Sequence, residues 1–117
     1  MPKLKEVVQD LAGRDGVDSV LVLSADGLAI EQASRTSFDA ESLAALTASV
    51  VQYVARLGLG ANAGPLRSAV LEYERALLII AQLETGECLA LVAAPGADLG
   101  SLLYDLRQQR PALAALF

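Results

Sequence analysis

The chain has 117 residues, the length of one domain. Hydrophobic residues make up 54% of the sequence and charged residues 20%, a balance that excludes an intrinsically disordered protein. The formal net charge is −5, whereas nucleic-acid-binding proteins usually carry a basic surface, so we expect no nucleic-acid partner. A single cysteine, Cys88, and the absence of histidine exclude an intramolecular disulfide, a cysteine–histidine zinc site and a catalytic triad with an imidazole base.

The first residues do not have the pattern of a signal peptide, because Glu6 and Asp10 interrupt any apolar core. The longest uninterrupted apolar runs, at 76–81 and 88–94, are far shorter than the roughly 20 residues that cross a bilayer. We therefore expect a cytoplasmic protein that does not insert directly into a membrane.

Hydrophobic periodicity and turn residues predict three helices and five strands. In chain order they are a helix over 3–12, strands over 17–24 and 28–33, a helix from 37 or 39 to about 57, strands over 66–74, 76–83 and 88–94, and a helix that begins after 98. The first two strands are joined by an Ala-Asp-Gly turn, in which Gly27 supplies a positive φ. Ser37 or Asp39 can cap the second helix, which is expected to end at Gly58.

The third helix is expected to begin at an Asp98 cap, and Pro111 is expected to end or kink it. The first, fourth and fifth strands are apolar on both faces, which predicts that helices cover both sides of the sheet. Short hairpin connections make neighbouring strands antiparallel, and a single sheet then requires the first strand to pair with the fifth. The expected fold is therefore α/β (α+β), in the order α-β-β-α-β-β-β-α. Its five-stranded antiparallel sheet has the order 2-1-5-4-3, with the second helix on one face and the first and third helices on the other.

The second helix carries more apolar surface than packing on one sheet requires. The stripe of large residues expected to pack on the sheet is Leu43, Leu46, Val50, Val54 and Leu57. Beside it lies a stripe of small residues, Ala40, Ala44, Ala48, Val51 and Ala55. A spare apolar stripe is typical of contact with another chain, although alanine is also a good helix former on an exposed surface.

The third strand is expected to be a poorly protected edge of the sheet. Its centre, Ala69–Leu71, has no lysine or proline to discourage pairing, and nearby charges protect it only in part. An open edge beside an under-charged helix predicts a two-fold homodimer, and the alternative is a monomer that tolerates the edge. The expected dimer interface is Ala40, Ala44, Ala48, Val51 and Ala55 of the helix with Arg67, Ala69, Val70, Leu71 and Tyr73 of the strand.

No combination of residues in the sequence assembles an enzyme active site. Cys88 lies in an apolar strand, where a thiol is inert packing. The glycine-rich segment 58–64 follows a helix and precedes a strand, the reverse of a phosphate-binding loop. Asp10, Asp15 and Asp18 lack the spacing of a calcium loop. We therefore expect no catalytic residue, no cofactor and no metal ion.

Three segments of the sequence are informative together: the hairpin Val20–Leu28 with its Asp-Gly turn, the alanine-rich helix Phe38–Leu57, and Leu89–Gly100 leading into Tyr104 and Asp105. With these segments in this element order, the chain resembles the Roadblock domain family, which includes roadblock-type dynein light chains and prokaryotic small-GTPase regulators of the MglB type. The resemblance covers nearly the whole chain, and we expect a single Roadblock-like domain over 1–117.

The resemblance implies a homodimer joined through the second helix and the third strand, with one sheet continuing across the two-fold axis. It also implies a non-catalytic surface, formed by the paired second helices, that binds a Ras-like small GTPase. On this chain that surface corresponds to Glu41, Ala45, Ser49, Gln52 and Arg56. The expected function is thus regulation of, or adaptor binding to, such a GTPase. The alternatives are a structural dimerisation scaffold of a motor or polarity complex and a small-molecule sensor, which the scarcity of aromatic residues disfavours.

Overall fold

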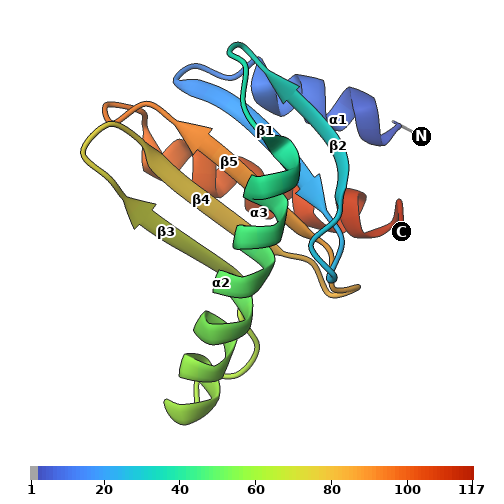
Figure 1. The fold of residues 1–117 in the computed structure, drawn as a ribbon, viewed down its shortest axis with the longest axis vertical. Coiled ribbons are helices and arrows are strands. Elements are labelled where there is room, and N and C mark those ends of the chain that lie inside the picture. Colours follow the sequence, from blue (N-terminus) through green and yellow to red (C-terminus); the bar gives the residue numbers. More distant parts are fainter. Residues whose placement is uncertain (1–2) are drawn as a thin grey trace.

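The computed structural model describes residues 3–117 and confirms the predicted order of elements (Figure 1). The described residues form α1 (Leu4–Ala12), β1 (Val17–Leu23), β2 (Ala29–Ser34), α2 (Ala40–Gly60), β3 (Ser68–Glu72), β4 (Leu77–Gln82), β5 (Cys88–Ala93) and α3 (Leu99–Ala114). Their five strands make one antiparallel sheet in the predicted order β2-β1-β5-β4-β3.

The sheet lies between two hydrophobic layers, as the apolar strands predicted. On one face α1 and α3 pack over side chains such as Val20, Ile79 and Leu91. On the other face α2 packs over the alternate residues, among them Leu21 and Ile80. Because successive side chains of a strand point to opposite faces, the central strands contribute to both layers and have few polar residues.

Aspartate side chains cap the two longer helices. The Asp39 carboxylate accepts a hydrogen bond from the backbone N–H of Ser42 at 3.2 Å, and this bond holds the pKa of Asp39 below its ordinary value. Asp98 accepts a hydrogen bond from the backbone N–H of Ser101 at 3.1 Å. Each bond satisfies one of the N–H groups that the first turn of a helix leaves without an intrahelical partner. The structure therefore selects Asp39, rather than Ser37, as the cap of α2.

The prediction that α2 ends at Gly58 is wrong, because the helix continues to Gly60. A glycine inside a helix costs only about 1 kcal/mol, so it does not by itself stop the helix. The helix ends where Asn62 takes a left-handed conformation with φ 54°. The N–H of Asn62 then donates to the Leu59 carbonyl and the N–H of Ala63 to the Gly58 carbonyl, the paired hydrogen bonds of a Schellman motif.

Of the two predicted effects of Pro111, that it ends α3 or kinks it, the first is wrong, since the helix runs through it to Ala114. Proline removes one helical hydrogen bond, but tertiary contacts hold the last turn in place. Leu113 is buried in the core beneath the sheet. On the preceding turn, the Arg110 guanidinium donates hydrogen bonds to the backbone carbonyls of Arg67 and Gln82.

Helix α2 is long and apolar enough, by length and composition alone, to cross a membrane. The longest uninterrupted apolar runs of the sequence do not include this helix, because polar residues such as Glu41, Thr47 and Gln52 are scattered through it. One such helix is weak evidence for a membrane segment, because helices of soluble proteins pass the same test. In this fold one side of α2 packs on the sheet.

Replacing the cap of α3 tests its contribution to stability. Asp98→Ala removes the side-chain acceptor for the Ser101 N–H and is expected to destabilise the protein by about 1 kcal/mol, or roughly 4 °C in Tm. Asp98→Asn keeps an acceptor oxygen and serves as the control, with a Tm close to that of the unaltered protein. Thermal unfolding followed by circular dichroism measures both, and equal losses in the two variants would contradict the capping role.

Candidate functional site: the exposed sides of α2 and the open edge of β3

The side of α2 that packs on the sheet is not the predicted stripe of large residues. Ala44, Thr47 and Val51 are the buried residues of the helix. In contrast, Leu46 and Leu57 are 65% and 74% exposed. The two stripes have therefore exchanged roles in part: Ala44 and Val51 seat the helix and Leu46, Val50 and Leu57 lie open, whereas Leu43 and Val54 are partly buried.

The reason for the exchange is a close approach of α2 to the β1–β2 turn. Gly27 is buried with φ +87°, and a side chain there would come within 3.2 Å of the Cβ atom of Ala48 and 3.3 Å of the Cα atom of Ala45. Small residues on both sides let the helix backbone lie almost against the turn. The sequence predicted a positive φ at Gly27, but not that α2 would cover it.

This packing corrects the interface residues predicted on α2. Two of these residues, Ala44 and Val51, are buried in the core of their own chain. The other three, Ala40, Ala48 and Ala55, are only partly exposed. Large exposed apolar side chains instead recur at spacings of three and four residues, which places them along one side of the helix. We call this set the apolar flank of α2; it consists of Leu46, Val50, Tyr53 and Leu57.

The apolar flank lies on the side of α2 toward β3. Ala48 and Gln52, on the opposite side of the helix, face the turns that follow β1 and β4. Figure 1 shows these turns on one side of α2 and β3 on the other. On β3, Ala69 pairs with Ile80 and Leu71 with Leu78, so the side chains of Ala69 and Leu71 point to the same face of the sheet as α2. The flank and the α2-facing residues of β3 are thus on the same face of the sheet, on the same side of the helix.

Strand β3 is an open edge within the part of the chain that the structure describes, where it pairs with β4 alone. The other residues predicted there are placed differently. Val70 pairs with Ile79 and points to the α3 side of the sheet, with 37% of its side chain exposed. Arg67 and Tyr73 are exposed just beyond the two ends of the strand. The edge therefore offers unpaired backbone groups flanked by exposed side chains.

The predicted partner surface on the outer side of α2 is exposed along its whole length: Glu41, Ala45, Ser49, Gln52 and Arg56. The Arg56 guanidinium carbon lies 5.5 Å from the centroid of the Tyr53 ring, a cation–π contact that connects this surface to the apolar flank. Gln52 and Arg56 also border a hollow of about 370 Å³ between α2 and the turns at Ser24 and Gly86. The outer side thus combines hydrogen-bonding groups, one exposed positive charge and a concave edge.

Cys88 also borders this hollow, but it is only 2% exposed. Burial raises the pKa of its thiol to about 11, so the side chain stays protonated at neutral pH and is a poor nucleophile. Within residues 3–117, no group of three or more histidine, cysteine, aspartate or glutamate residues is arranged to hold a metal ion.

Comparison with known proteins identifies the family. The model of the Roadblock/LC7 domain matches residues 3–93, and the chain therefore belongs to the Roadblock/LC7 domain family. A solved Roadblock/LC7 domain from Streptomyces avermitilis is 27% identical, with a TM-score of 0.82 over 96% of this chain and 98% of that one. Comparison with curated protein sequences gives no match.

Solved structures of MglB have the same fold at lower sequence identity. MglB from Myxococcus xanthus is 19% identical, with a TM-score of 0.89 over 97% of this chain and 93% of that one. An MglB structure with a tetrameric arrangement is 21% identical, with a TM-score of 0.86 over 95% of this chain and 85% of that one. These similarities confirm the fold that the sequence predicted, and the family-model match confirms the family.

The raised pKa of Cys88 predicts low reactivity in the folded protein. At pH 8 a thiol-specific disulfide reagent is expected to react with it much more slowly than with a free thiol, because both burial and the small thiolate fraction oppose attack. Reactivity increases as the pH approaches about 11 or when denaturant unfolds the chain. Absorbance of the released thiolate follows the reaction, and rapid labelling at pH 8 without denaturant would contradict the buried position.

Proposed function

We propose that the protein is a homodimeric, non-catalytic regulator or adaptor of a Ras-like small GTPase. The observation that carries the proposal is the apolar flank of α2 beside the open edge of β3. Exposed large apolar side chains that are contiguous with an unpaired strand are typical of an interface with another protein chain. A second copy with the same surface can complete both features at once across a two-fold axis.

The proposed dimer interface differs in emphasis from the one that the sequence predicted. Its main contacts on α2 are the residues of the apolar flank, Leu46, Val50, Tyr53 and Leu57. On β3 its contacts are Ala69 and Leu71. Each large side chain contributes roughly 1 kcal/mol or more when it is removed from water. Antiparallel pairing of β3 with its copy adds backbone hydrogen bonds between the chains. The open edge of β3 also includes Arg67, Val70 and Tyr73. The margin of the proposed interface on α2 consists of the partly exposed Ala40, Ala48 and Ala55.

Pairing of two α2 helices would bring their outer sides together as one platform for the GTPase. Glu41, Ser49, Gln52 and Arg56 supply the polar groups of that platform, and Ala45 leaves room for close approach. A GTPase carries its own nucleotide site, so a partner can change its rate by reshaping its switch loops without catalytic groups of its own. Membership of the Roadblock/LC7 family and the fold shared with MglB support this assignment.

The experiment that tests the function measures binding and GTP hydrolysis with the Ras-like GTPases encoded in the same genome. We expect one of them to form a complex and to hydrolyse GTP at an altered rate when the protein is added. Arg56→Ala is expected to weaken this complex roughly tenfold, the effect of losing one charge-assisted hydrogen bond. Arg75→Ala is the matched control, because Arg75 is an exposed arginine in the turn between β3 and β4, away from α2.

Two results would contradict parts of the proposal. Absence of binding to every such GTPase would contradict the GTPase partner. Binding with an unchanged hydrolysis rate would exclude regulation and leave the protein as a structural scaffold. If Arg56→Ala and Arg75→Ala weakened the complex equally, the outer side of α2 would not be the contact surface.

A further inference from the structure

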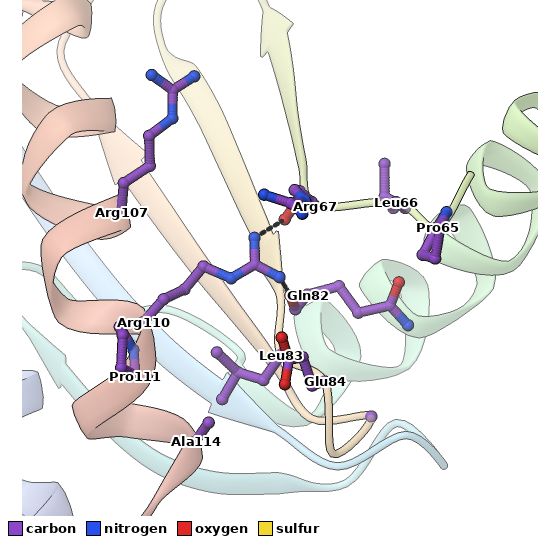
Figure 2. Close-up of a pocket in the computed structure, with 11 residues that line it drawn as sticks. Pro65, Leu66, Arg67, Gln82, Leu83, Glu84, Arg107, Arg110, Pro111 and Ala114 are labelled. Atoms are coloured by element: carbon purple, nitrogen blue, oxygen red, sulfur yellow. Dashed lines mark hydrogen bonds between the residues drawn. The ribbon is translucent and has the colours of Figure 1, made fainter. Parts of the chain in front are cut away.

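A second hollow lies between α3 and the adjacent ends of β3 and β4, and it shares Gln82 and Gly86 with the hollow beside α2 (Figure 2). Its volume is about 550 Å³, within the range of roughly 300–1,000 Å³ that is common for ligand pockets. Three arginines line it, Arg67 before β3 and Arg107 and Arg110 on α3. Residues that are 43 positions apart in sequence, Arg67 and Arg110, are hydrogen-bonded to each other here.

The charge of this hollow is opposite to that of the whole chain. The sequence has nine basic and 14 acidic residues, yet three arginines and a single carboxylate, Glu84, line the hollow. Both ion pairs found among residues 3–117 are made by Arg14, so within the described chain no carboxylate forms an ion pair with Arg67, Arg107 or Arg110. A local excess of positive charge on an acidic protein attracts an acidic partner and gives it an orientation.

Arg107 and Arg110 do not converge on one point of the hollow. The guanidinium of Arg110 is fixed between the backbone carbonyls of Arg67 and Gln82. Figure 2 shows the Arg107 side chain, one turn earlier on α3, extending away from that point. A single phosphate ion needs convergent donors, whereas spaced guanidinium groups fit carboxylates distributed along an extended chain.

The hollow also has apolar walls that a small anion would not use. Leu83 is buried at its base, and Leu66 is partly buried beside it. Pro65 and Pro111 add rigid apolar surface on the two sides. A ligand that fills this space therefore combines negative charges with at least one apolar side chain.

We propose that this hollow, which we call the α3 groove, binds an acidic peptide segment of a partner protein, with carboxylates at the arginines and an apolar side chain over Leu66 and Leu83. Because α3 and α2 cover opposite faces of the sheet, the outer side of α2 stays accessible while the groove is occupied. The protein can thus hold two partners at the same time, one on each face.

A labelled acidic peptide tests this proposal on the intact protein. The probe is a short fluorescein-labelled peptide of repeated Glu-Glu-Leu, and fluorescence anisotropy measures its dissociation constant. Arg107→Glu replaces an exposed attractive charge with a repulsive one and is expected to weaken binding about tenfold. Arg75→Glu makes the same change of net charge outside the groove and is expected to change the affinity less than about twofold. Circular dichroism verifies that both variants are folded.

Control peptides and ions separate the proposed ligand from other anions. Replacement of every glutamate in the probe by glutamine, or of every leucine by serine, is expected to weaken binding, because the groove needs both charge and apolar contact. Amide chemical shifts are expected to change near Leu66, Leu83 and Ala114, which border the groove.

Several results would overturn the proposal. These are absence of probe binding at millimolar protein concentration, equal losses in Arg107→Glu and Arg75→Glu, and shift changes confined to α2. Displacement of the probe by inorganic phosphate at similar concentration would also overturn it, because the groove would then be a site for small anions. GTPase binding plays no part in these measurements, so their outcome is independent of the function proposed for α2.

Discussion

The close packing of α2 on the sheet determines which apolar side chains of that helix are exposed. The helix can approach because Ala44, Thr47 and Val51 are small enough to face the strands, and because Gly27 leaves room for Ala48 over the β1–β2 turn. With small residues inside, Leu46, Val50, Tyr53 and Leu57 of the same helix face outward. The apolar flank of α2 is therefore a direct consequence of how the helix is seated, and it lies on the side of the helix toward the open edge of β3.

The sheet order could be predicted from the sequence because several independent signals agreed. Strands that are apolar on both faces had to be central, short hairpins fixed the antiparallel neighbours, and one sheet then allowed a single order. The orientation of α2 could not be predicted in this way. Periodicity shows that the helix has two apolar stripes, but it does not show which one is buried. That depends on Gly27, a residue of another element, whose lack of a side chain favours the smaller stripe.

The ends of two helices could not be predicted from nearby residues alone either. Gly58 and Pro111 weaken a helix by known amounts, yet both lie inside helices here. The Schellman motif at Asn62 and the hydrogen bonds of Arg110 to the backbone of Arg67 and Gln82 stabilise the extra turns. The α3 groove was missed for a related reason. Its arginines come from segments far apart in the sequence, and only the packing of α3 against the strand ends brings them together.

Amide hydrogen exchange in β3, measured over a range of protein concentrations, tests the central claim most directly. If a second copy completes the edge, the β3 amides that are not bonded to β4 are protected at high concentration and lose protection on dilution. Val50→Glu, which puts a charge in the apolar flank, abolishes that protection, whereas Leu59→Glu, on another side of α2, preserves it. Rapid exchange of these amides at every concentration, with a mass of 12.2 kDa in solution, would contradict the account.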